Sequence, residues 1–193
     1  MKIDWKTFLA DAGAEFAAEN VAHFGNPQRE QEVALSGLVF SDLSHLSVIA
    51  VHGADAESFL QSQFTNDISQ VSDNSTRLNA YCTPKGRMLG LMRVFRLGGT
   101  WYLRLPEDTA EAVMQRLRMY VMRADVTIED VSDNFVRIGI SGEHAVEELG
   151  AATNVVPAEI DQVTHTADIM LLRVPGDQPS YEAYISTHDI ESK

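Results

Sequence analysis

Two neighbouring stretches decide the fold of this chain: DLSHLSVIAVHGADAESFLQSQFTND at residues 42–67 and LNAYCTPKGRMLGLMRVFR at residues 78–96. The apolar run at 46–51 predicts a strand that leads into a helix. Three further strands in hairpin order are predicted at 78–82, 88–95 and 101–105. The turns between them, at 84–86 and 98–99, contain the Pro and Gly residues of antiparallel connections. The stretch therefore indicates an α+β fold.

The joint between the strand and the helix occurs twice in the sequence. The pattern Gly-x-x-Ala-x-x-x-Leu stands at residues 53–60 and again at 142–149, each time directly after an apolar run. Glycine lets the backbone turn sharply, and Ala and Leu four residues apart lie on one helix face that can pack closely on a sheet. The repeat predicts an internally duplicated α+β fold with mainly antiparallel sheets and packed helices.

The remaining elements are predicted from periodicity and from Gly and Pro positions. Further helices are expected at 3–20, 106–122 and 143–149, and further strands at 33–40, 126–129, 135–140, 169–174 and 181–185. The expected domains are an N-terminal helix and polar connector at 1–32, a first half at 33–123 and a second half at 124–193. A last helix is expected to begin at Thr187, so close to Lys193 that we expect a truncated fragment.

Length and composition are those of an ordinary globular protein. The chain has 193 residues, of which 45% are apolar, and it can bury a sizeable core. No apolar run approaches the roughly 20 residues that a membrane-spanning helix needs, so no membrane association is expected. The N-terminus lacks the apolar core of a secretory signal, and a single cysteine excludes an internal disulfide. A reducing, cytoplasmic location is therefore expected.

The charge of the chain is unevenly distributed. The net charge of −13 argues against general nucleic-acid binding, which depends on clustered Lys and Arg. Residues 85–123 nevertheless hold eight of the fifteen basic residues and three acidic ones. This basic island is either a solvated face whose arginines pair with acids elsewhere or a site for an anion.

Several short motifs resemble a known family in their order and spacing: Asp42 to Leu46, residues 53–61, Thr65 to Asp67, residues 84–87 and Arg96. They resemble the folate-binding superfamily that contains the glycine-cleavage T-protein and the YgfZ-type proteins linked to iron–sulfur cluster maintenance. The resemblance implies the N-terminal portion of a protein that binds the cofactor tetrahydrofolate in a central cavity. In the YgfZ-type branch it also implies iron–sulfur proteins as partners.

Six residues are predicted to contact the folate: Leu46, Asn66, Tyr81, Lys85, Arg87 and Arg93. Leu46 corresponds to a cavity-lining position in relatives, and the alternative is an ordinary core leucine. For Asn66 the alternative is closure of the turn after the helix. Lys85 and Arg87 on the turn, with Arg93 and Arg104 on neighbouring strands, are expected to meet the carboxylate tail of folate, which Arg binds with two parallel hydrogen bonds.

The residues that would carry aminomethyl transfer are missing. In the T-proteins an aspartate pair follows the glycine turn, and Gly90 and Leu91 stand at those positions here. Neither can act as an acid, a base or an electrostatic partner. The resemblance therefore points to the YgfZ-type branch, in support of iron–sulfur enzymes or tRNA modification. The alternatives are a T-protein-like aminomethyltransferase and a non-catalytic interaction module that has lost its ligand.

No catalytic residue and no metal site are predicted. Cys82 lies on an apolar strand, where a lone cysteine most often acts as a small buried hydrophobe. The six histidines show no metal-ligand spacing. The YgfZ-type signature Lys-Gly-Cys-Tyr-x-Gly-Gln-Glu, which contains the important cysteine of that branch, does not occur in these 193 residues.

Overall fold

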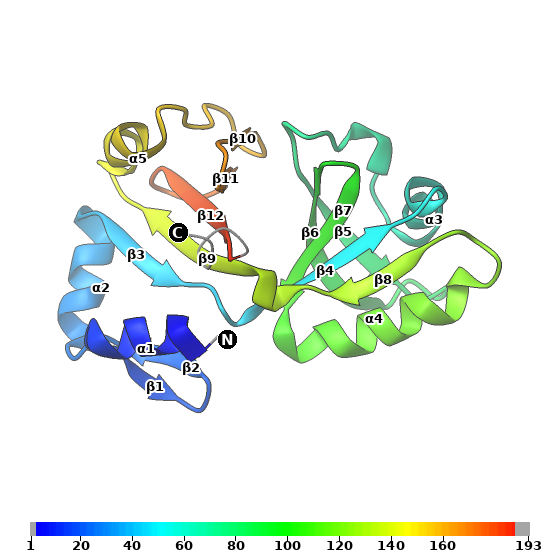
Figure 1. Ribbon diagram of the computed structural model, residues 1–193. Helices are drawn as coiled ribbons and strands as arrows, with labels where there is room; N and C mark the ends of the chain where they lie inside the picture. The colour runs from blue at the N-terminus through cyan, green and yellow to red at the C-terminus, as the bar shows by residue number, and fades with distance from the viewer. Residues whose placement is uncertain (1–2, 188–193) are drawn as a thin grey trace. The chain divides into compact units, whose positions relative to one another are not determined.

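A computed structural model describes residues 3–187 of the chain and divides them into two compact units (Figure 1). One unit comprises residues 46–132, and the other comprises the described residues of 1–45 and 133–193. Each unit contains a five-stranded antiparallel sheet.

The sheet of the 46–132 unit has the strand order β5-β6-β7-β4-β8. Its strands are β4 (Leu46–His52), β5 (Arg77–Cys82), β6 (Met88–Leu97), β7 (Thr100–Pro106) and β8 (Thr127–Asp130). Its helices are α3 (Ala56–Gln63), the short 3-10 helix η1 (Ile68–Gln70) and α4 (Glu107–Val121). The long helix α4 lies against β4, β6, β7 and β8, as Figure 1 shows.

The core of this unit lies between the helices and one face of the sheet. Alternate residues of a strand point to the same face, so each strand contributes every second side chain. The buried core includes Ile49, Val51, Met92, Val94, Leu103 and Leu105 from the strands, and Phe59, Leu60, Val113 and Leu117 from the helices. Burial of each such apolar side chain stabilises the fold by roughly 1.5 to 3 kcal/mol.

The second sheet has the strand order β10-β11-β12-β9-β3. Its strands are β3 (Val39–Asp42), β9 (Phe135–Ser141), β10 (Val163–His165), β11 (Ile169–Val174) and β12 (Ser180–Ser186), and α5 (Ala145–Thr153) packs on it through Ala145 and Leu149. The same unit contains α1 (Ile3–Asp11), the hairpin of β1 (Glu15–Ala17) and β2 (Asn20–His23), α2 (Pro27–Ser36) and the 3-10 helix η2 (Ser132–Asn134), which begins at the last residue of the first unit.

The predicted internal duplication is confirmed by the strand orders. The order β5-β6-β7-β4 in the first sheet corresponds strand by strand to the order β10-β11-β12-β9 in the second. All neighbours in both runs pair antiparallel. In both sheets the fifth strand pairs antiparallel with the strand before the glycine joint: β8 pairs with β4, and β3 pairs with β9. The edge strands are exchanged between the repeats, because β3 leads along the chain into β4 and β8 leads into β9.

The glycine of each joint packs against backbone, which explains the repeated motif. Gly53 and Gly142 have φ values of +123° and +135°. A Cβ at Gly53 would lie 2.1 Å from the carbonyl oxygen of Asp125, and a Cβ at Gly142 would lie 2.1 Å from that of Gly37. Asp55, the N-cap of α3, donates its N–H to the Asp125 carbonyl at 3.2 Å and accepts the Asp125 N–H at 2.8 Å. Both joints therefore require glycine.

The N-terminal segment differs from the prediction. The expected helix at 3–20 ends at Asp11, where Gly13, with φ +94°, turns the chain into the β1–β2 hairpin. The expected connector at 23–32 and the beginning of the expected strand at 33–40 form α2 instead. This helix starts where the Asn26 side chain accepts the N–H of Arg29 and Pro27 occupies the first turn. The prediction from sequence did not use these capping signals and therefore missed the helix.

The compact units also differ from the expected halves at 33–123 and 124–193. β8 lies in the expected second half but pairs with β4 in the sheet of the 46–132 unit. β3 lies in the expected first half but pairs with β9 in the other sheet. The difference arises because hydrogen bonds between distant segments decide which sheet an edge strand joins. Strand β10 was not predicted. The helix expected from Thr187 falls on residues 188–193, outside the described part of the chain.

We predict that Gly53→Ala destabilises the protein by more than about 3 kcal/mol, because the substitution combines a strained φ with a clash against backbone. Gly86→Ala is the matched control: Gly86 has φ +78° on the hairpin turn, with nothing within 4 Å of a Cβ. Strain alone is expected to cost about 1 to 2 kcal/mol there. Urea unfolding measures both values, and equal losses would contradict the role of the close approach at Gly53.

Candidate functional site

The sheet of the 46–132 unit has a second face that points away from the α3 and α4 core. We call it the helix-distal face and define it by the alternate residues Leu46, Val48, Ala50, Leu78, Ala80, Arg93, Phe95, Tyr102 and Arg104. Val48 and Phe95 are fully buried, and Arg93 is only 5% exposed. A face that mixes buried apolar residues with arginines differs chemically from the apolar, helix-covered face.

Arg93 and Arg104 lie directly opposite each other on β6 and β7. The expectation that they share a face is confirmed by this register. Arg93 donates from Nη1 to the Thr76 hydroxyl at 2.7 Å within a buried environment. Two neighbouring guanidinium groups can both donate charge-assisted hydrogen bonds to a carboxylate.

An aromatic pair stands next to the two arginines on the same face. The rings of Phe95 and Tyr102 are stacked, with centroids 5.2 Å apart and an interplanar angle of 12°. Burial raises the pKa of Tyr102 above its ordinary value, opposed by a hydrogen bond with Thr100. The neutral phenol is therefore the stable form at this face. Aromatic rings and arginines are the groups that suit a ligand with a flat ring and an anionic tail, although Phe95 itself is fully buried.

The predicted cations do not converge on one point. Lys85 and Arg87 are exposed on the turn between β5 and β6, where the Gly86 N–H donates to the Thr83 carbonyl at 2.8 Å. Arg93 follows Arg87 by six residues along an extended strand, a separation of roughly 20 Å at 3.3 Å per residue. The basic island therefore contains at least two separate cationic places, one on the turn and one on the helix-distal face.

Tyr81 belongs to the helix-covered core rather than to the helix-distal face. It is 3% exposed and packs edge-on against Phe64, with centroids 6.1 Å apart. Burial raises the pKa of its hydroxyl, and the charge of Arg116 opposes this effect. Leu46 lies at the start of β4 on the helix-distal face, half-buried. The structure thus separates Tyr81 from the other strand residues predicted to contact folate.

Asn66 and Asp67 hold the loop after α3. The Asn66 N–H donates to the Asn79 side chain at 2.8 Å, and its amide nitrogen donates to the Leu78 carbonyl at 2.7 Å. Asp67 caps the η1 helix. Its carboxylate accepts hydrogen bonds from the hydroxyl of Ser69, which has the larger effect, and from the N–H of Ser69, and these bonds hold the pKa of Asp67 below its ordinary value. These contacts support the turn-closing alternative for Asn66.

The described residues offer neither a metal site nor a membrane-spanning helix. No group of three or more His, Cys, Asp or Glu side chains in residues 3–187 is placed to hold a metal ion. Among the helices within that range, none is long and apolar enough to cross a membrane. Cys82 is a half-buried free cysteine.

Sequence reasoning missed the aromatic pair and a hollow beside α4. Strict alternation along β6 and β7 places Phe95 and Tyr102 beside the arginines, and this signal was readable. The hollow depends on a register shift between β5 and β6, and no residue pattern in the sequence predicts that shift.

Comparison with known proteins establishes the family. The model of the GCVT N-terminal domain matches residues 10–171, which is most of the chain. The protein therefore belongs to the GCVT N-terminal domain family, and the resemblance predicted from the motifs is confirmed.

Relatives come from both branches of the superfamily. The tRNA-modifying protein YgfZ of Hamiltonella defensa subsp. Acyrthosiphon pisum (strain 5AT) is 32% identical over 131 residues, covering 67% of this chain and 38% of that protein. The aminomethyltransferase of Shouchella clausii (strain KSM-K16) is 27% identical over 175 residues, covering 86% and 47%. The chain thus spans less than half the length of either relative.

A solved structure confirms the fold. The crystal structure of glycine cleavage system aminomethyltransferase T from Bartonella henselae superposes with a TM-score of 0.81 at 18% identity. The superposition covers 98% of this chain and 55% of that one. At this identity the likeness establishes the α+β architecture and nothing more.

Because burial raises the pKa of Tyr81 in the folded state, we predict an alkaline loss of stability. The neutral hydroxyl stabilises the fold below the unfolded pKa of about 10, and this contribution is lost as pH rises through the folded pKa. In Tyr81→Phe the free energy of unfolding should fall less between about pH 8 and about pH 11. Identical pH profiles for wild type and Tyr81→Phe would refute the assignment.

Proposed function

We propose that the chain is part of a tetrahydrofolate-binding protein that supports iron–sulfur proteins or tRNA modification in the cytoplasm. Relatives named tRNA-modifying protein YgfZ support the second half of this proposal. The observation that carries the first half is the arrangement of Arg93 and Arg104 beside the stacked Phe95 and Tyr102. Iron–sulfur proteins are the proposed partners.

The residues of the helix-distal face fit the chemistry of a folate. Its flat pterin and aminobenzoyl rings suit an aromatic and aliphatic surface, to which Leu46 also contributes. Its glutamate carboxylates suit guanidinium groups, which bind them with two parallel hydrogen bonds. We assign these roles to Leu46, Arg93 and Arg104, and we assign Lys85 and Arg87 to electrostatic attraction of the tail from the exposed turn. Tyr81 and Asn66 support the scaffold.

Aminomethyl transfer is the weaker candidate, although relatives named aminomethyltransferase match 86% of the chain. Gly90 lies on β6 under α4, and a Cβ there would come within 2.9 Å of Val113 Cγ2. A carboxylate at this position needs α4 to shift. Leu91, the other position, is 46% exposed and apolar. Neither residue supplies a charge for a cationic intermediate.

We expect tetrahydrofolate to bind saturably when it is titrated anaerobically into the 193-residue chain in a calorimeter. Arg104→Gln should weaken binding by about 1 to 3 kcal/mol, the range for a hydrogen bond to a charged group. Arg87→Ala should weaken it by up to about 1 kcal/mol at low salt and less at high salt, because Arg87 is exposed and screened.

Arg29→Gln is the matched control for this titration, since Arg29 is an exposed cation of the other unit that pairs with Glu32. Its affinity should equal that of the wild type. Folded protein that takes up no tetrahydrofolate would favour the interaction module over the proposal. Unchanged affinity in Arg104→Gln would limit that arginine to a structural role.

We further expect background activity in an assay that forms methylenetetrahydrofolate with the other glycine-cleavage components. The physical reason is the absence of a carboxylate at Gly90 and Leu91. A genuine T-protein assayed in parallel controls for the other components. Turnover above background by the wild-type chain would contradict this prediction and favour the hypothesis that the protein is an aminomethyltransferase.

A further inference from the structure

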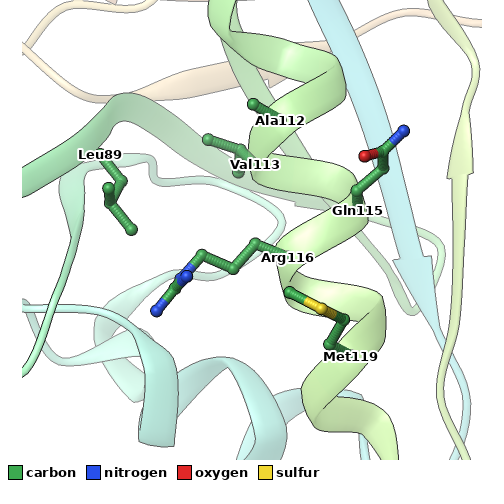
Figure 2. Close-up of a pocket in the computed structure, with 6 residues that line it drawn as sticks. All are labelled: Leu89, Ala112, Val113, Gln115, Arg116 and Met119. Carbon is green, nitrogen blue, oxygen red and sulfur yellow. The ribbon is translucent and has the colours of Figure 1, made fainter.

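A hollow beside α4 is not used by the proposed function. It has a volume of about 520 Å³ and lies between β6 and the helix. Its lining residues, drawn in Figure 2, are Leu89, Ala112, Val113, Gln115, Arg116 and Met119. The volume falls within the range of about 300 to 1,000 Å³ that is typical of small-molecule sites. Apart from Arg116 and Gln115, the lining is apolar.

A bulge in β6 forms one wall of this hollow. Tyr81 pairs with Gly90 and Cys82 pairs with Met88, so Leu89 is an extra residue without a partner on β5. Such a bulge re-aims a side chain, and Leu89 packs beside the helix-covered core. Gly90 next to it contributes no side chain, which lets Val113 of α4 approach closely. Bulges of this kind are frequent next to functional sites.

Arg116 brings a positive charge into the hollow. Figure 2 shows its side chain extending from α4 into the space between the helix and Leu89. Its Nη2 makes a long hydrogen bond of 3.4 Å to the Tyr120 hydroxyl, and its guanidinium lies 5.7 Å from the centre of the Tyr120 ring. A hydrogen bond also joins Arg116 to the hydroxyl of a second phenol, Tyr81.

The guanidinium is incompletely satisfied by these neighbours. Its Nε is buried without a hydrogen-bond acceptor, although a guanidinium has five N–H donors. Within residues 3–187, Arg116 makes no ion pair with a carboxylate. A buried donor without an acceptor destabilises the protein. An anion that entered the hollow would accept hydrogen bonds from the terminal nitrogens and would share the phenol hydroxyls as additional donors.

We propose that this hollow binds a small organic carboxylate with an apolar body. Arg116 binds the carboxylate through its planar pair of donors, which matches that group better than a lysine does. Leu89, Val113 and Met119 contact the apolar body. The site lies on the helix-covered side of the sheet, whereas Arg93 and Arg104 lie on the helix-distal face. It is therefore independent of folate binding to that face.

Benzoate is the probe, titrated into the ¹⁵N-labelled chain and followed by the backbone amide signals. Saturable shifts are expected at Leu89 and along residues 112–119. Acetate lacks the apolar body and benzyl alcohol lacks the charge, so each should bind at least about tenfold more weakly. Arg116→Gln should raise the benzoate Kd by about tenfold or more. Arg123→Gln is the control, because Arg123 is an exposed arginine just after the same helix.

The same spectra show whether Arg116→Gln is folded. If it is not, Arg116→Lys provides the second test, since it keeps the charge, loses the planar fork and should also lose about tenfold in affinity. The proposal is overturned by an unchanged benzoate Kd in the folded variants. It is also overturned by the absence of saturable shifts up to about 50 mM benzoate. Inorganic phosphate that binds as tightly as benzoate with the same dependence on Arg116 would overturn the assignment to a carboxylate.

Discussion

The close approach of backbone at the two glycine joints constrains the rest of the fold. At Gly53 and Gly142 the space that a Cβ would fill is occupied by a carbonyl oxygen of the segment that leads into the edge strand. That segment can cross the joint only where the side chain is missing. The joint therefore fixes the edge strand and the start of the helix together. Because the helix start is fixed, the face of the sheet that the helix covers is fixed as well.

The two faces of the 46–132 sheet acquire different chemistry from this arrangement. α3 and α4 bury an apolar surface on one face, so charged side chains on the central strands are excluded from it unless they lie at its margin. Arg93 and Arg104 accordingly point to the helix-distal face, while Arg116 lies at the margin of α4. A chain of net charge −13 can thus present local positive sites without a basic surface overall.

Sequence patterns predicted the parts of the fold that depend on neighbouring residues. The strands at 78–82, 88–95 and 101–105 were found because their turns need Gly98, Gly99 and Gly86 at positive φ. The exchange of edge strands was not found, because strand partners that lie 75 to 102 residues apart in the sequence leave no local pattern. At the site, the alternation of side chains along the strands placed Arg93 and Arg104 on one face. The family motif did not indicate that the Tyr81 side chain is buried in the core. Periodicity alone also extended the first helix through Gly13.

Gly90 connects the missing acid with the hollow beside α4. A side chain longer than hydrogen at this position would push against Val113, whose Cγ2 lies 2.9 Å from the Cβ position. The glycine that removes the carboxylate therefore also lets α4 approach β6 at that point. Leu89 is the extra residue of the bulge in β6, and Arg116, three residues after Val113 and so close to one turn beyond it, extends into the space between α4 and Leu89. The lack of an acid on β6 and the close packing of α4 on that strand therefore depend on the same residue, Gly90.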